Sequence, residues 1–576
     1  MSDNFNTIKE FVDDVCGKYS ENIAYRFFRD ETIEDRTYAD LKRDVYGLAS
    51  ALVNKGLNSE HIAILGSTSY EWIVSFLAVI LSGNIVIPID KMLLKDEMMF
   101  LFRAGDVTTI LYDEEFETVA KEAKRGIKKL VNINCMQNEE FAGMFKTKEV
   151  ELPEKDPEEL CEILFTSGTT GVSKGVMISQ KNIISNLKEI HRLDFATNFA
   201  GPKVVMSVLP IHHTFELTVD NLGILCYGAT ICINDSIENI AKNLNVFKPS
   251  VLLIVPAIAE ALYKKIKDSM LDPKTARKIN SGKKLVKAAK TVGVDARRSV
   301  FKSLLDKFGG NLNNVVVGGA ALRPEIVECF AEFGINVFQG YGLTECAPLV
   351  CANCPTENKI GSVGKPHNVE VKTVNGELVV KGDVVMLGYY KNEDATNEVI
   401  KDGWFYTGDL GYIDDEGFVF ITGRSKNVII LDNGKNIYPE ELEEKINVIE
   451  GVKSSFVYGD KGRLCALVLP ENPGDKDKRK AIETAIKKIN ESLPAYKKIT
   501  FISFTHRDFP RTTTLKIKRH ELLEMVKSQL VKNEVKYVAP TNPTEEKLVS
   551  AFEQILAKRV GIYDDFFDLG GDSLSA

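Results

Sequence analysis

The sequence predicts an α/β protein with a large first domain, a small α+β domain and a short helical segment at the end. Short apolar stretches alternate with amphipathic helical stretches through most of the first 420 residues, a pattern typical of buried, largely parallel sheets covered by helices. From about residue 360 the sequence becomes richer in strands. At 576 residues the chain is also too long for one ordinary domain.

The first domain is expected to span residues 1–424. Its longest apolar stretch, residues 72–90, is interrupted by Ser82-Gly83-Asn84, which predicts a buried helix and then a buried strand rather than a membrane span. The Lys-rich stretch 263–309 predicts helices whose charges form a solvated face, and Asn375-Gly376 predicts a hairpin turn. The expected strands lie within 61–67, 84–90, 108–114, 203–210, 250–256, 313–320 and 335–342.

Three further segments follow. Residues 425–535 are expected to form a small α+β domain, and Ala539-Pro540 and Asn542-Pro543 punctuate a linker at 536–544. Residues 545–576 begin with an amphipathic helical pattern.

Composition narrows the class of protein. A hydrophobic fraction of 44% allows a large core. A net charge of −8 argues against bulk binding of nucleic acid or an anionic membrane, although it does not exclude a local basic channel. The N-terminus carries acidic residues and no apolar signal-peptide core, so a cytoplasmic protein with no transmembrane segment is expected. Cys351 and Cys354 form a lone C-x-x-C near Cys346, without the second ligand pair that zinc requires.

The strongest local signal is LFTSGTTGVSKGV, residues 164–176. Glycines let successive backbone N–H groups point into one concavity, and hydroxyls and Lys174 add donors and positive charge. This chemistry favours a phosphate-binding loop, although the spacing differs from a Walker A motif. A polar surface loop is the alternative.

Further motifs make the resemblance specific. Residues 340–345 (GYGLTE), 406–424 (YTGDLGYIDDEGFVFITGR) and 435–443 (KNIYPEELE) follow the loop in turn. In this order the motifs resemble those of the adenylate-forming superfamily, and the resemblance extends to about residue 520. It implies an enzyme that uses ATP to convert a carboxylic acid into an acyl-adenylate, with release of pyrophosphate.

The resemblance also implies site residues in the first domain. Thr344 would contact the α-phosphate, Glu345 would bind Mg²⁺, and Asp409 and Arg424 would hold the ribose. The remaining implied ATP-binding residues are Thr166, Ser167, Gly168, Thr169, Thr170 and Lys174 at the phosphates, and Gly318, Gly319, Ala320, Tyr341 and Gly342 around the adenine.

In the second domain the resemblance implies a catalytic lysine. PRTTTLKIKRHEL, residues 510–522, places Lys516 there, and the spacing favours it over Lys518. The sequence departs from the pattern at Leu515, where many relatives have glycine. Lys426 corresponds to the hinge about which the second domain rotates, and Gly434 to the thiol channel.

The acid and the acceptor are predicted from two other segments. Relatives that activate amino acids usually carry an Asp just after the strand at 204–209, to pair with the substrate ammonium. This chain has LPIHHTFELT, residues 209–218, with no carboxylate at that place, and the segment resembles long-chain fatty acyl-CoA ligases. His213 is expected to line the acyl pocket, and a satisfied core histidine is the alternative. The tail, ending in GGDSLSA, resembles the first half of an acyl or peptidyl carrier domain, with Ser573 as the phosphopantetheine attachment site. Because only half is present, modification of Ser573 is expected to be poor.

The predicted function is therefore activation of a medium- or long-chain fatty acid with ATP and Mg²⁺, followed by transfer to the pantetheine thiol of CoA. One alternative is loading of an acyl carrier protein by a fatty acyl-AMP ligase. Another is amino-acid adenylation within a peptide synthetase. A non-catalytic relative is disfavoured, because Lys516, Glu345 and Asp409 are all present.

Overall fold

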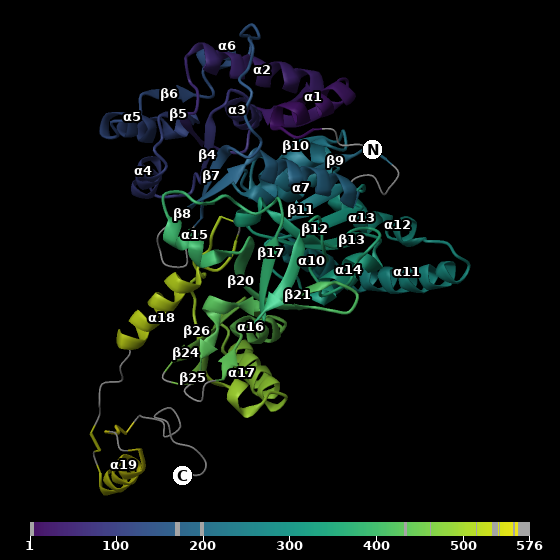
Figure 1. Cartoon of the computed structure of the whole chain (residues 1–576). Helices are drawn as coiled ribbons and strands as arrows, with labels where there is room; N and C mark the ends of the chain where they lie inside the picture. The colour runs from purple at the N-terminus through teal and green to yellow at the C-terminus, as the bar shows by residue number, and fades with distance from the viewer. Residues whose placement is uncertain are drawn as a thin grey trace. The chain divides into compact units, whose positions relative to one another are not determined.

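The computed structural model describes residues 5–166, 173–195, 201–430, 435–460, 462–513, 515–532, 539–540, 542–556 and 559–562. The chain divides into two compact units: Met1–Ser425 with Thr513–Leu515, and Lys426–Thr512 with Lys516–Ala576. Each unit is described by itself below (Figure 1). The first is an α/β unit that carries three sheets, and the second is a smaller α+β unit.

The largest sheet of the first unit has nine strands in the order β15-β14-β13-β12-β11-β9-β10-β1-β2. The strands from β13 to β1 run parallel, which confirms the predicted parallel sheet, while β14, β15 and β2 are antiparallel edges. The strands are β1 (Ile23–Arg29), β2 (Thr32–Thr37), β9 (Val204–Ser207), β10 (Thr230–Ile233), β11 (Val251–Ile254), β12 (Asn314–Val317), β13 (Asn336–Gly342), β14 (Leu349–Ala352) and β15 (Lys365–Pro366).

The second sheet has seven strands in the order β18-β8-β7-β4-β3-β5-β6. Its strands are β3 (His61–Leu65), β4 (Ile85–Ile89), β5 (Thr109–Tyr112), β6 (Asn132–Cys135), β7 (Leu160–Thr166), β8 (Lys174–Ser179) and β18 (Gly388–Tyr389). Strands β7 and β8 are antiparallel, and Thr166 is the Cα partner of Lys174. The predicted phosphate loop is therefore the connection of a hairpin.

A third sheet joins β16 (Glu370–Val374), β17 (Glu377–Lys381), β19 (Ile400–Lys401), β20 (Trp404–Ile413) and β21 (Val419–Arg424). The predicted hairpin turn is confirmed between β16 and β17. Asn375 and Gly376 have φ values of 52° and 82°, as a two-residue turn with both central residues left-handed requires.

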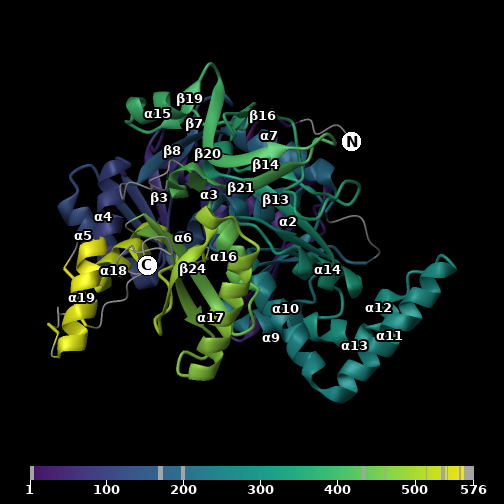
Figure 2. The ribbon, with the colours of Figure 1, turned by 90° about the horizontal axis from the view of Figure 1, so that it is seen from below.

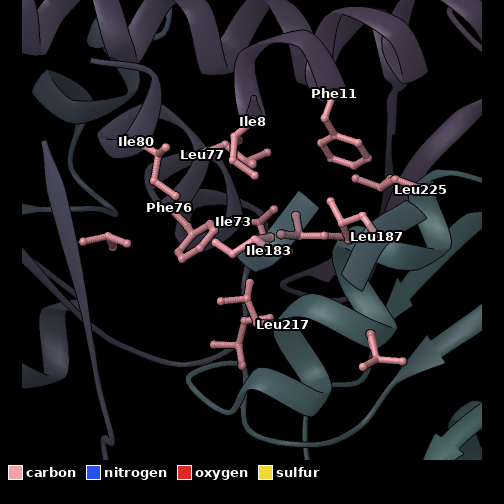
Figure 3. Packing of buried hydrophobic residues seen from close by; sticks show 14 of the residues in the cluster. Ile8, Phe11, Ile73, Phe76, Leu77, Ile80, Ile183, Leu187, Leu217 and Leu225 are labelled. Carbon is pink, nitrogen blue, oxygen red and sulfur yellow. The ribbon is translucent and has the colours of Figure 1, made fainter. Parts of the chain in front are cut away.

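Helices of the first unit bury their apolar faces in a core shared by the first two sheets. The predicted helix and strand within 72–90 are confirmed as α3 (Tyr70–Leu81), which Ser69 caps, and β4. Figure 3 shows side chains of α1 (Ile8–Lys18), α3 and α7 (Gln180–Leu193) converging, among them Phe11, Phe76 and Leu187. The other α-helices of this unit are α2 (Tyr38–Asn54), α4 (Lys95–Ala104), α5 (Glu117–Gly126), α6 (Glu139–Met144), α8 (Gly223–Leu225), α9 (Ile240–Phe247), α10 (Pro256–Leu271), α11 (Pro273–Thr291), α12 (Arg297–Val300), α13 (Lys302–Leu305), α14 (Pro324–Glu332) and α15 (Glu393–Val399).

The second unit has a three-stranded sheet of β24 (Val452–Asp460), β25 (Arg463–Pro470) and β26 (Ile499–Phe504), and a short pair of β22 (Ile429–Ile430) and β23 (Asn436–Ile437). Its helices are α16 (Pro439–Asn447), α17 (Lys476–Glu491), α18 (Arg519–Lys532) and α19 (Pro543–Leu556). Within the described ranges of both units, none of the helices combines the length and apolar character needed to span a bilayer.

Candidate active site

The candidate site of the first unit begins where two neighbouring parallel strands end. Strands β12 and β13 pair through Val317 and Gln339, so Gly318-Gly319-Ala320 and Tyr341 follow at the same carboxyl edge of the sheet. Open α/β sheets bind ligands at this edge. Gly319 has φ +88°, which favours glycine, and a Cβ on Gly318 would lie 2.9 Å from Phe215 Cζ.

Asp409 forms the centre of a hydrogen-bonded group. It lies on β20 opposite Arg424 of β21, and only 4% of its surface is exposed. The Tyr341 hydroxyl donates to Asp409 Oδ2 (2.7 Å), and Arg424 Nε donates to Oδ1 (2.7 Å). Burial, and then the charge of Asp409, raise the pKa of Tyr341, so the phenol stays protonated and can donate. The structure thus brings Tyr341 of the motif 340–345 together with Asp409 and Arg424 of the motif 406–424.

The backbone before Asp409 is held in place by its neighbours. Thr407 Oγ1 accepts from the Asp409 N–H (3.0 Å) and donates to the carbonyl of Leu378 (2.8 Å). Gly408 has φ +73° and donates its N–H to Glu377 Oε1 (2.8 Å). Each oxygen of Asp409 accepts one of these two hydrogen bonds and has a second lone pair, so the carboxylate can still accept from a diol such as ribose.

A second group links the phosphate loop to the predicted metal ligand. Glu345 lies in the short turn Thr344–Cys346 after β13, and the Tyr389 hydroxyl donates to Glu345 Oε1 (3.0 Å). Lys174 Nζ lies 4.6 Å from the centre of the Tyr389 ring, a cation–π distance. One tyrosine therefore contacts both a predicted phosphate-binding cation and a predicted metal-binding carboxylate.

Tyr389 is the residue that sequence reasoning missed. It sits on β18, which pairs with β8, and its side chain is 6% exposed. Burial, and then Glu345, raise its pKa, so it remains a hydrogen-bond donor. Its only sequence signal is an aromatic residue after Gly388, which also fits an ordinary strand. The contact with Glu345 depends on a strand pairing that the local sequence does not specify.

His213 lies in the turn after β9 and is half-buried, not enclosed in the core. Its ring centre is 4.4 Å from that of His212, whose Nε2 is 3.5 Å from Asp90 Oδ2 at the end of β4. Burial opposes the ionisation of Asp90, but the contact with His212 outweighs it and lowers the pKa of Asp90. The predicted pocket histidine therefore belongs to a polar group at the ends of two strands.

A π-helix follows this turn, at Phe215–Leu222. Such helices are rare and are frequent at functional sites, and nothing in the sequence distinguished this one from an α-helix. Glu216 is fully buried, and its Oε1 accepts from the Ser207 hydroxyl. Burial raises the pKa of Glu216 to about 8 and that of the neighbouring, fully buried Asp220 well above its ordinary value. Neither acid reaches the surface.

In the second unit, Lys516 is exposed and lies in a tight turn. Its N–H donates to Thr512 Oγ1 (3.1 Å), and the Thr512 N–H donates to the Lys516 carbonyl (2.8 Å). Leu515 has φ +63°, a left-handed value that costs about 1–2 kcal/mol for a residue with a Cβ. The departure from glycine noted in the sequence therefore falls on a residue whose backbone favours glycine.

The turn is anchored by a buried ion pair between two of the predicted motifs. Arg519 donates to both oxygens of Glu443, at 2.8 and 2.9 Å. Glu443 is 8% exposed, and its burial raises its pKa although Arg519 opposes the shift. This pair connects the segment 435–443 to the segment that carries Lys516.

Lys426 lies in the turn Ser425–Asn427, where the second unit begins. Ser167, Gly168, Thr169, Thr170, Gly434 and Ser573 lie outside the described residues.

Two protein-family matches correspond to the two units of the chain. Residues 12–390 match the AMP-binding enzyme family, and residues 426–532 match the AMP-binding enzyme C-terminal domain. The chain therefore belongs to the AMP-binding enzyme family.

Two curated relatives carry related names. "Long-chain-fatty-acid--CoA ligase FadD15" of Mycobacterium bovis is 26% identical over 570 residues, which cover 88% of this chain and 94% of the relative. "Long chain acyl-CoA synthetase 4" of Arabidopsis thaliana is 28% identical over 481 residues, covering 74% and 71%. The crystal structure of ATP-bound MatB from Rhodopseudomonas palustris has a TM-score of 0.74 at 22% identity and covers 91% of this chain and 99% of its own, which shows a common fold.

Proposed function

We propose that this chain is an AMP-forming acid–thiol ligase that activates a medium- or long-chain fatty acid and passes the acyl group to the thiol of CoA. The observation that carries the proposal is the hydrogen-bonded group in which Tyr341, at the end of β13, and Arg424 both donate to the buried carboxylate of Asp409. The relatives named as long-chain acyl-CoA ligases support the choice of acid and acceptor.

The first step joins the acid to AMP. A carboxylate oxygen attacks the α-phosphorus of ATP, the bond from that phosphorus to the bridging oxygen breaks, and pyrophosphate leaves. Negative charge is crowded in the transition state, so positioned cations and donors provide the main stabilisation. Lys174, Thr344 and Lys516 would supply these groups, and Asp409 would hold the ribose.

Mg²⁺ fits the residues present. Glu345 offers a carboxylate, and Tyr389 orients it through Oε1. Magnesium in nucleotide sites commonly uses one or two carboxylates together with phosphate oxygens and water, so a single protein ligand suffices. When bound, the ion would neutralise charge on the phosphates.

The second step transfers the acyl group. The sulfur of CoA attacks the acyl carbon, the bond to the adenylate oxygen breaks, AMP leaves and the thiol proton is released. No substrate ammonium is expected in the acid pocket, because Glu216 and Asp220, the acidic residues that follow β9, are fully buried. This burial favours an apolar acid over an amino acid.

A second candidate acceptor is the pantetheine of a carrier protein. The observation that favours it is the sequence of the tail, residues 545–576, with Ser573 in GGDSLSA. On this alternative the first step is unchanged, and a carrier thiol replaces CoA in the second.

The experiment measures pyrophosphate release with a panel of fatty and amino acids, and then thiol capture by CoA or by a pantetheinylated carrier. Release with fatty acids and capture by CoA are expected, whereas release with none of the acids would contradict the proposal. Lys516→Ala should abolish release while thioester formation from a supplied acyl-adenylate continues. Equal loss of both steps would show that Lys516 has a different role.

A further inference from the structure

Helix α11 concentrates positive charge in an acidic protein. Its 19 residues contain seven basic side chains and no acidic one, although the chain carries a net charge of −8. The basic residues are Lys274, Arg277, Lys278, Lys283, Lys284, Lys287 and Lys290. The sequence predicted a solvated face here, and exposure alone would satisfy that prediction. The sign and the density of the charge require a further explanation.

One side of α11 packs against the rest of the first unit. Ile279 is buried, and a Cβ on Gly282 would lie 2.8 Å from Phe301 Cε1. Lys283 Nζ is 2.7 Å from Glu332 Oε2, so this lysine has a structural partner. In both overall views α11 lies at the edge of the first unit, away from its sheets (Figures 1 and 2).

The opposite side carries charge that the fold does not neutralise. Lys274, Arg277 and Lys284 are exposed. They lie on the same side of α11, because spacings of three and seven residues return to nearly the same side of a helix. Among the residues that the structure describes, no carboxylate lies within 4.0 Å of these three cations. Surface cations are ordinarily interspersed with anions, so the unbalanced face points to an anionic partner.

Aliphatic side chains are exposed among these cations. Leu285 is 62% exposed in the middle of α11, Leu271 is 79% exposed where α10 ends, and Val292 and Val294 are exposed just after α11. Basic residues mixed with exposed aliphatic ones are typical of helices that lie in the headgroup region of a bilayer. The stretch 264–300 contains no aromatic residue, so it lacks the stacking platforms of single-stranded nucleic-acid sites.

We propose that the exposed face of α11 docks the protein on an anionic lipid bilayer. The cations would contact lipid phosphates, and the aliphatic side chains would enter the headgroup layer, without a membrane span. The inference rests on the charge and exposure of α11 and is independent of the acid that the enzyme activates. Docking would place the enzyme at a surface into which long-chain fatty acids partition.

The test is co-sedimentation of the full chain with vesicles. Binding is expected to phosphatidylcholine vesicles containing about 30% phosphatidylglycerol and not to pure phosphatidylcholine, and it should be lost at about 0.5 M salt. The variant Lys274→Gln/Arg277→Gln/Lys284→Gln should weaken binding roughly hundredfold, since each basic residue near an anionic surface contributes about fivefold. Leu285→Ser should weaken it a few-fold at every salt concentration.

A matched control carries the same charge change elsewhere. Lys476, Lys480 and Lys487 are exposed on α17, a helix that also contains acidic residues. Changing these three to Gln should leave vesicle binding within about twofold, since Asp477, Glu483 and Glu491 interrupt the positive charge of α17, and none of its described residues is an exposed large hydrophobic one. Both triple variants should release pyrophosphate at the wild-type rate, which shows that they are folded.

Several results would overturn the inference. Equal binding to both kinds of vesicle would show that anionic lipid is not what the protein recognises. Equal losses of binding in the α11 and α17 variants would show that α11 is not the docking site. Binding of a single-stranded RNA that depends on α11, without binding to vesicles, would identify nucleic acid as the partner.

Discussion

Tyr389→Phe removes one hydroxyl and leaves the aromatic ring in place. The hydroxyl donates to Glu345 Oε1 at 3.0 Å from a side chain that is 6% exposed. Hydrogen bonds to charged groups contribute about 1.5–3 kcal/mol. If Glu345 binds the magnesium of ATP, its loss of orientation should lower kcat/KM for ATP by roughly tenfold to hundredfold.

Two further variants separate the hydroxyl from the ring. Tyr389→Leu should lose a further few-fold, because the cation–π contact of Lys174 with the ring contributes about 0.5–2 kcal/mol. Tyr390→Phe is the matched control, because that neighbouring hydroxyl donates to Asp106 instead (2.8 Å). It should leave kcat/KM nearly unchanged.

The assay is steady-state pyrophosphate release at varied ATP, with thermal unfolding measured for each variant. A value of kcat/KM within about twofold of wild type for Tyr389→Phe would refute the reasoning, since it corresponds to less than the smallest expected contribution. Equal losses in Tyr389→Phe and Tyr390→Phe would also refute it, by showing a general effect on the strand.

Three other predictions concern stability. Gly318→Ala should lower the free energy of urea unfolding by about 1–3 kcal/mol, because the added Cβ would lie 2.9 Å from the ring of Phe215. Gly17→Ala is the control: Gly17 lies in a helix with open space around it, and its substitution should raise the same free energy by about 0.5–1 kcal/mol. Burial raises the pKa of Glu162 from 4.5 to about 8, so its stabilising contribution is complete below pH 4.5 and is lost as the pH rises through 8. Relative to wild type, Glu162→Gln should therefore gain up to about 1.4 kcal/mol per pH unit in that window, and a constant difference would contradict this. Arg519→Leu leaves Glu443 buried without its cation and should destabilise the second unit by about 3–5 kcal/mol. Hydrogen exchange should become faster in β24 and α18, and an unchanged exchange rate would contradict this prediction.

Alternating strands and helices predicted the α/β class correctly, because the buried strands are nearly continuous apolar stretches. The same local pattern predicted α3 followed by β4, and Asn375-Gly376 predicted its turn, since each depends on residues close in sequence. The motif order also identified Asp409, Arg424 and Tyr341 as candidates.

Contacts between distant residues could not be predicted in the same way. Tyr341 and Asp409 are 68 residues apart, and Tyr389 and Glu345 are 44 apart, so both contacts depend on how the sheets assemble. The π-helix at 215–222 was also missed, because its hydrogen-bond pattern leaves no distinct periodicity over so few residues. The burial of Glu216 could not be predicted either, because carboxylate side chains are normally exposed.

The hairpin formed by β7 and β8 has a consequence for how its loop can evolve. Cross-strand partners Thr166 and Lys174 fix the separation of the two ends, so the seven intervening residues, 167–173, can change in number or composition without shifting any other strand. Insertions in such a loop carry only a small entropic cost. If this loop binds phosphate as proposed, substitutions in it can change nucleotide binding while the pairing of β7 and β8 is kept.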